Sequence, residues 1–171
     1  MTLEERIEAL ERRQNLLRAR EEIWHTITRY ARGIDEMRPE ELEAIFTDDA
    51  ASQTHPWTRR LEGKALVVKG FRNYQRTFQK PRRFITNEQI QVRDDGTATG
   101  YANWFVVQSH EGKSYYGWGS YDWKFRYEDQ SWKISEMIVT IDCMTTLDRG
   151  WGMLEDRVMP FPPRPDAAIP A

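Results

Sequence analysis

Few side chains in this sequence could act as nucleophiles, bases or metal ligands. The chain of 171 residues has one cysteine and three histidines. This set offers no plausible group of zinc ligands, and a lone cysteine cannot form an internal disulfide. Gly117 and Gly119 fall inside an expected strand and not at a strand-to-helix turn, so they form no phosphate loop. We therefore expect no metal and no nucleotide cofactor, and chemistry that side chains perform as acids and bases.

His55 is the histidine whose position is best suited to catalysis. It lies in the segment ASQTHPW, which we place at the mouth of the fold with Trp57 as a substrate-binding residue. A histidine there could donate or accept a proton near neutral pH, although a single loop histidine is more often a surface residue. His25 and His110 are expected to be structural or solvated. Cys143 has no histidine near it in the sequence, so we expect a buried small apolar side chain.

Three helices are expected before the strands begin. Residues 4–32 contain no Gly or Pro and are rich in Glu, Arg, Leu and Ala, which favours one long helix. Its first part, residues 1–20, is an arm that carries apolar residues at heptad-like spacing: Leu3, Ile7, Leu10 and Leu17. Such a stripe is typical of a surface helix or of a helix that contacts another subunit. Shorter helices are expected over residues 39–46 and 64–78, the second ended by Pro81.

From Arg83 onward the period of the apolar residues changes to two, which is typical of strands. Strands are expected over residues 83–92, 98–109, 114–127 and 132–143, with two short strands in residues 50–62. Helices followed by long antiparallel strands predict an α+β domain over residues 21–152. Five prolines between positions 160 and 170 exclude a helix, so residues 153–171 are expected to form an extended tail. From about Met159 to Pro170 the tail is expected to cover the mouth of a pocket, either its own or that of a neighbouring copy.

Charge and hydropathy exclude several classes of partner. The 25 Lys and Arg residues nearly balance the 27 Asp and Glu residues, so nothing favours nucleic acid or an anionic membrane. No apolar run approaches the ~20 residues that span a bilayer, and no signal-peptide pattern opens the chain, so we expect the cytoplasm. The expected partners are a hydrophobic small molecule and, because of the apolar stripe on the arm, further copies of the chain in a dimer or trimer.

Five segments, in this order and at this spacing, resemble the SnoaL-like branch of the nuclear-transport-factor-2-like superfamily. They are YARGIDEMRPEELEAIFTDDA (30–50), GKALV (63–67), RRFITNEQIQV (82–92), DGTATGYANWFV (95–106) and SYDWKFRYEDQSWKI (120–134). The resemblance covers roughly residues 1–145, and the opening MTLEERIEALERR is particularly similar to bacterial bile-acid 7α-dehydratases. It implies a curved antiparallel sheet wrapped by three helices, which form a cone with an internal pocket. Relatives of this kind include scytalone dehydratase, hexachlorocyclohexane dehydrochlorinase, polyketide cyclases and steroid isomerases.

The resemblance also implies where the active site lies. In the dehydratases an aspartate at the position of Asp35 orients a histidine base on the first long strand, and the matching residue here is Arg83. An arginine stays protonated and is a poor base, but it can hold a phenolate or oxyanion with two parallel hydrogen bonds. Tyr30 matches a pocket tyrosine that can donate to a leaving hydroxyl. The alternative is that Asp35 and Arg83 form a buried ion pair that only ties the helix to the sheet.

Strand alternation extends this site into a lining. If Arg83 points into the cone, Ile85 and Asn87 should do so as well. Matching the other strands to the family adds further inward positions, and the expected substrate-binding residues are Asn87, Trp104, Tyr121, Met137 and Ile141. Aromatic walls, with room left by Gly117 and Gly119, suit an aromatic or polycyclic ligand. The alternative is that these side chains simply fill the core.

These observations predict a cofactor-independent lyase that acts on a hydrophobic aromatic or polycyclic alcohol. It would eliminate water, or release formaldehyde from a lignin-derived diaryl diol as diarylpropane lyases of this fold do. One alternative is an isomerase or cyclase of the polyketide or steroid type. Another is a non-catalytic member of the fold: a ligand-binding domain, or a small subunit of a ring-hydroxylating dioxygenase.

Overall fold

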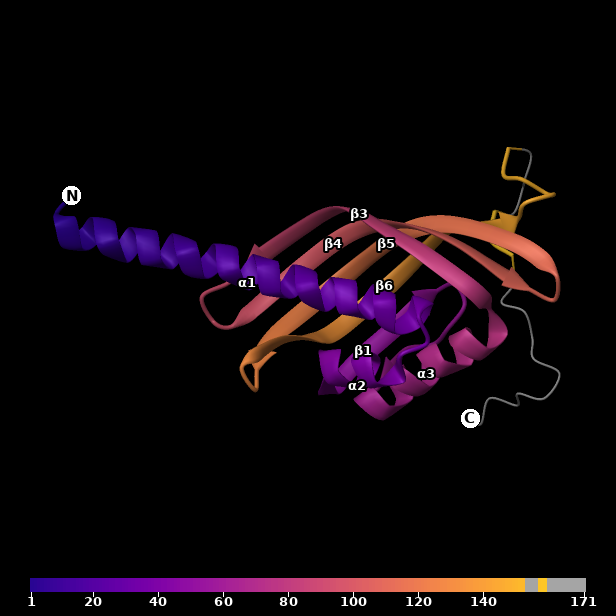
Figure 1. Cartoon of the computed structure of the whole chain (residues 1–171), viewed down its shortest axis with the longest axis horizontal. Helices are drawn as coiled ribbons and strands as arrows, with labels where there is room; N and C mark the ends of the chain where they lie inside the picture. Colours follow the sequence, from indigo (N-terminus) through magenta and orange to yellow (C-terminus); the bar gives the residue numbers. More distant parts are fainter. Residues whose placement is uncertain (153–156, 160–171) are drawn as a thin grey trace.

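The computed structural model of the chain describes residues 1–152 and 157–159 (Figure 1). These residues form three helices and a six-stranded sheet with the strand order β2-β1-β6-β5-β4-β3. The predicted α+β class is confirmed. Most of the predicted tail lies outside the described residues. Where residues 157–159 are described, Val158 forms a parallel bridge with Met144 near the end of β6.

Helix α1 (Leu3–Asp35) is longer than the sequence predicts. Thr2 begins it with a capping box, in which its side chain and that of Glu5 bond each other's backbone N–H groups. The helix continues through Gly33 to Asp35. Glycine at position 33 lets helix α2 (Pro39–Ile45) pack closely, since a Cβ would lie 3.0 Å from Leu42 Cδ2. The extra turn places Asp35 at the very end of the helix.

Helix α3 (Lys64–Thr77) covers the same end of the molecule as α2 (Figure 1). It ends four residues before Pro81, which lies inside β3 instead of stopping the helix. The buried amide of Gln75 donates to the carbonyls of Gly33 and Ile34 in the last turn of α1, which also accept from the backbone N–H groups of Arg38 and Met37. Helix α3 thereby fixes where α1 ends.

The long strands form an antiparallel meander of β3 (Gln79–Val92), β4 (Thr97–His110), β5 (Lys113–Glu128) and β6 (Ser131–Thr146). The short strands are β1 (Phe46–His55) and β2 (Leu61–Glu62). β1 runs parallel to β6, so the expectation of a wholly antiparallel sheet is wrong at this one pairing. The parallel pairing is possible because α3 carries the chain from the β1–β2 edge to the opposite edge, where β3 begins.

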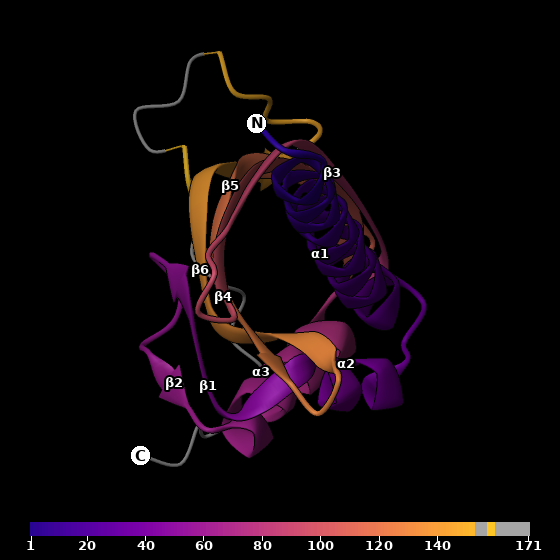
Figure 2. The same cartoon turned by 90° about the vertical axis from the view of Figure 1, so that its left-hand side faces the viewer.

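The sheet curls around α1, so that its concave face and the helix enclose the core (Figure 2). Ile23, Ile27, Tyr30 and Ile34 form the buried face of the helix. They pack against inward side chains of the strands, among them Trp104, Tyr121, Trp123, Phe125 and Met137. The core is therefore rich in aromatic rings, with Asp35 and the start of β3 at one margin of it.

Candidate active site

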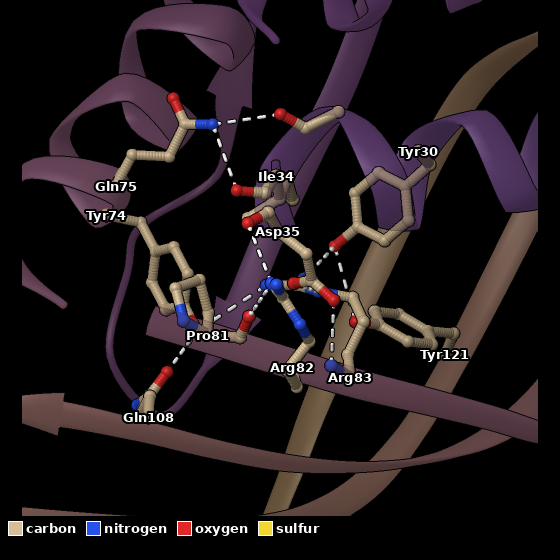
Figure 3. Close-up of polar contacts among 11 residues, drawn as sticks. Tyr30, Ile34, Asp35, Tyr74, Gln75, Pro81, Arg82, Arg83, Gln108 and Tyr121 are labelled. Atoms are coloured by element: carbon tan, nitrogen blue, oxygen red, sulfur yellow. Dashed lines mark hydrogen bonds and ion pairs between the residues drawn. The ribbon is translucent and has the colours of Figure 1, made fainter. Parts of the chain in front are cut away.

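The end of α1 needs positive charge, and the start of β3 supplies it. A carboxylate at a helix C-terminus faces the negative end of the helix dipole, which is unfavourable without a compensating cation. The guanidinium of Arg82 donates to the Asp35 carbonyl at 3.1 Å. The guanidinium of Arg83 meets the Asp35 carboxylate itself (Figure 3). The two consecutive arginines thus neutralise the helix end from opposite faces of one strand.

Arg83 holds both oxygens of Asp35. Its Nε donates to Oδ1 at 2.7 Å, and its backbone N–H donates to Oδ2 at 2.8 Å. The side chains are 6% exposed for Arg83 and 11% exposed for Asp35. Removing one partner from such a pair would leave an uncompensated buried charge. The predicted meeting of Asp35 and Arg83 is therefore present in the structure.

Phenol groups surround the other two nitrogens of the guanidinium. Nη1 lies 3.4 Å from the Tyr30 hydroxyl and Nη2 lies 3.5 Å from the Tyr74 hydroxyl, and the guanidinium carbon is 5.7 and 5.5 Å from the centres of their rings. The Tyr30 hydroxyl in turn donates to that of Tyr121 at 3.3 Å. Figure 3 shows these side chains converging from α1, α3, β3 and β5. Because the Nη contacts are long, both groups remain available to a better acceptor.

Burial controls the protonation of this cluster. It raises the pKa of Tyr74 to about 12 and that of Tyr30 well above the usual value, because a phenolate would be desolvated there. Burial also disfavours the charge on Arg83, but Tyr74, Tyr121, Tyr30 and Asp35 outweigh it and hold the pKa of Arg83 above its usual value. At neutral pH the cluster therefore combines neutral phenols with a protonated guanidinium.

The sequence interpretation missed Tyr74 and Gln108 as members of the site. Tyr74 shares the helical spacing of the apolar residues Phe71 and Phe78, which is typical of a core side chain and gives no sign of a role in the site. The structure shows that its hydroxyl bonds the side-chain oxygen of buried Gln108. A polar side chain at the inward position 108 of an otherwise apolar strand was the available signal, because buried amides need partners.

The expected lining residues Trp104, Tyr121, Met137 and Ile141 are all buried inside the cone. They form one packed cluster, in which Tyr121 contacts Trp104 and Trp123 with ring centroids 6.2 and 4.7 Å apart. The glycines of β5 do not leave room for a ligand as expected. A Cβ on Gly119 would lie 1.9 Å from the Thr140 carbonyl oxygen, so this glycine permits close approach of β6.

Three predicted site residues lie away from Arg83. Asn87 is exposed, because a bulge between Thr86 and Gln89 breaks the alternation of β3 and turns it outward with φ of 60°, where it bonds Asn103. The expectation that it points inward is wrong. His55 is exposed at the end of β1, next to Gln53. Trp57 is half-buried, stacks on Phe78 and donates to the Met159 carbonyl at 2.8 Å.

A hollow of about 220 Å³ opens onto the ion pair from outside the cone. It is lined by Asp35, Arg83 and the neighbouring surface of α1 and β3: Thr28, Ala31, Arg32, Glu36 and Arg82. A ligand could therefore reach the carboxylate and guanidinium through this hollow. Within residues 1–152 and 157–159, no three His, Cys, Asp or Glu side chains gather as metal ligands would, and no helix is long and apolar enough to cross a membrane.

The model of the SnoaL-like domain family matches residues 15–138. The chain belongs to this family. Among solved structures, the hexachlorocyclohexane dehydrochlorinase of Novosphingobium barchaimii LL02 is 17% identical with a TM-score of 0.73, over 88% of this chain and 99% of that one. A putative scytalone dehydratase from Novosphingobium aromaticivorans is 20% identical with a TM-score of 0.69, over 77% and 88% of the two chains. These likenesses confirm the expected fold.

An NTF2-like protein with a cystatin-like fold from Novosphingobium aromaticivorans gives a similar result, at 22% identity and a TM-score of 0.67 over 78% of this chain and 88% of that one. None of the curated proteins matches the chain. The family and the fold are thus shown, and the reaction must be argued from the site.

Proposed function

We propose that this SnoaL-like protein is a cofactor-independent lyase that works by acid–base chemistry at Asp35 and Arg83. The observation that carries the proposal is the buried guanidinium of Arg83, which is fixed through Nε by Asp35 and keeps two loosely bonded Nη groups. A fixed pair of donors in a site largely shielded from water is suited to a developing oxyanion or phenolate. A simple structural tie would not need these loosely bonded donors to converge with two phenols.

Each member of the cluster has a distinct part in the proposed elimination. Asp35 acts as the base that takes a proton from carbon, and the electron pair released forms the new double bond. Tyr30 stays protonated at neutral pH and donates its proton to the leaving oxygen as the carbon–oxygen bond breaks. Arg83 holds the charge that develops on the substrate. Return of the proton from Asp35 to Tyr30 restores the site.

The aromatic surroundings indicate the class of substrate. Tyr30, Tyr74 and Tyr121 present rings and hydroxyls beside the guanidinium, with Trp104 next to them. A substrate that displaces the long Nη contacts of Arg83 would lie against these rings, which favours an aromatic or polycyclic alcohol. We therefore propose loss of water from such an alcohol. In a diaryl diol Asp35 would instead take the proton of the terminal hydroxyl, and the carbon–carbon bond would break to release formaldehyde. The electron pair of that bond would form the double bond as the second hydroxyl leaves as water with the proton of Tyr30, and Arg83 would stabilise the substrate phenolate.

One observation favours a second candidate, a non-catalytic member of the fold. Both Asp35 oxygens already accept from Arg83, and the expected lining residues are packed against one another. On this view the ion pair ties α1 to β3 and the protein binds a ligand or partner without converting it.

Turnover by the purified chain separates the two candidates. It should be incubated with diaryl diols, hydroxysteroids and polycyclic alcohols in the presence of a chelator, with products identified by mass spectrometry. We expect one class to lose water or formaldehyde. The Arg83→Lys variant should then lose about 100-fold in rate, because lysine keeps the charge but not the planar donor pair.

The matched control is Arg126→Lys, which alters an exposed two-point Arg–Asp pair on β5 with Asp49. It should turn over substrate like the parent. Absence of any product with the whole panel, or an Arg83→Lys variant with the parent's rate, would favour the non-catalytic candidate.

A further inference from the structure

The N-terminal half of α1 carries an apolar surface that nothing covers within the described residues. It projects beyond the end of the sheet (Figure 1). Large apolar side chains recur on it at intervals of three, four or seven residues, and each is 47 to 73% exposed: Leu3, Ile7, Leu10, Leu17 and Trp24. We call these residues the arm stripe. An exposed stripe of this length is typical of a surface that binds another chain.

The arm stripe faces away from the body of its own molecule. Arg12, about 180° around the helix from the stripe at 3.6 residues per turn, bonds Asp94 of the β3–β4 hairpin at 2.6 Å. The buried residues Ile23 and Tyr30 continue that inner face along the helix. Since the inner face is already used, the stripe cannot be covered by this copy of the sheet.

A second uncovered apolar surface lies on the convex side of the sheet. It consists of outward side chains of β3 and β4, namely Phe84, Tyr101, Phe105 and Val107, and we call it the sheet patch. Phe84 and Phe105 are paired across the two strands, with ring centroids 6.4 Å apart. The concave side is filled by α1 (Figure 2), so the patch is directed to the exterior.

The charges beside the two surfaces are complementary. Arg6, Arg13 and Arg20 border the arm stripe at intervals of seven residues, and none of them has an ion pair among the described contacts. On the sheet, exposed Asp122 lies beside Tyr101 across the β4–β5 pairing, and exposed Asp142 lies on β6. Both carboxylates likewise lack an ion pair in the part of the chain that the structure describes.

The same arginines disfavour pairing of two arms with each other. In an antiparallel pair of helices centred on Arg13, this residue would meet the Arg13 of the other arm and Arg6 would meet Arg20. In a parallel pair Arg13 would meet Arg18, and only Arg6 would find an opposite charge, in Glu11. Like charges at these positions oppose association. The sheet patch, with the unpaired carboxylates of Asp122 and Asp142 on the neighbouring strands, is therefore the better partner for the arginine-edged stripe.

We propose that the arm of one copy docks on the sheet patch of a second copy, and that the two copies exchange arms about a two-fold axis. The apolar stripe then covers Phe84 and Phe105, and the arginine row faces Asp122 and Asp142. One contact of this kind accounts for both uncovered surfaces and for the unpaired charges of both signs. A reciprocal exchange also closes the assembly at a dimer.

Thiol cross-linking tests the docking mode. Leu10→Cys and Phe105→Cys are made as separate variants of the full chain. Three samples are treated with a short bismaleimide: each variant alone, and an equal mixture of the two. We expect a covalent dimer in the mixture and none with either variant alone. The parent is the control, because its Cys143 is fully buried. A covalent dimer from Leu10→Cys alone would show arm-to-arm pairing, and one from Phe105→Cys alone would show sheet-to-sheet pairing. Either result overturns the proposal, and so does the absence of a covalent dimer in all three samples.

Charge reversal provides a second readout that does not depend on cysteines. Arg13→Glu and Asp122→Arg alter exposed side chains and should each weaken dimerisation about tenfold in sedimentation experiments, since attraction becomes repulsion. The double variant should regain affinity. Single variants that dimerise like the parent would count against the proposed contact.

Discussion

Tyr74 shows how the environment of one residue sets its chemistry. Its hydroxyl lies between the Arg83 guanidinium and the Gln108 amide, away from bulk water. Burial favours the neutral phenol and raises its pKa to about 12. The unfolded chain, in which tyrosine ionises near pH 10, therefore loses its proton first as the pH rises.

A pH series of unfolding experiments tests this assignment. Between about pH 10 and pH 12 the folded state binds more protons than the unfolded state, so the free energy of unfolding should fall as the pH rises, by up to about 1.4 kcal/mol per pH unit for Tyr74. Below pH 10 this contribution should be constant. The Tyr74→Phe variant should show a shallower decline, and Tyr127→Phe, at a half-exposed position, should follow the parent. Identical slopes in all three proteins would show that Tyr74 titrates freely.

At the scale of helices and strands, the sequence pattern located every long element but not the points where they deviate from regular geometry. The change of period at Arg83 predicted β3. Trp104, Tyr121, Met137 and Ile141, which matching to the family placed inward on β4, β5 and β6, are buried. The alternation of inward and outward residues failed at Asn87. The bulge there depends on how β3 pairs with β4, and the apolar alternation of the β3 sequence gives no sign of it. Gly33 also misled the prediction, since its role is set by contact with Leu42 and not by helix propensity.

Gly119 is a sensitive point of the sheet. β6 has an irregularity opposite Trp118 and Gly119, which brings the Thr140 carbonyl within 1.9 Å of where a Cβ would stand. Gly119→Ala should therefore lower the free energy of unfolding by about 2–3 kcal/mol, because backbone must move to admit the methyl group. Gly152→Ala is the control, since a Cβ there meets nothing within 4 Å. Equal melting midpoints for the two variants in urea would contradict this reading of β5 and β6.

At the scale of the whole molecule, the fold brings residues from α1, α3, β3 and β5 to one margin of the cone. Asp35, Arg83 and Tyr30 were placed there from the family resemblance, and the structure brings all three together. The sequence did not place Tyr74 and Gln108 in the site, because they come close to Arg83 only when α3 packs on the sheet. His55 lies on β1, four strands away from β3 in the sheet order, and no local pattern could show this separation from Arg83. Contacts between residues so far apart in the sequence depend on the topology of the fold, which local sequence patterns do not specify.

The double variant Asp35→Leu/Arg83→Met tests the central claim that this pair performs the reaction. Each single change should lower the free energy of unfolding by about 3–5 kcal/mol, because it leaves a buried charge without its partner. The double variant should regain most of that stability, since two apolar side chains of similar size replace the pair. The decisive measurement is its turnover of the substrate that the parent converts. Our account predicts that the double variant is folded and about 100-fold or more slower than the parent. A folded double variant with the parent's turnover would show that Asp35 and Arg83 only join α1 to β3.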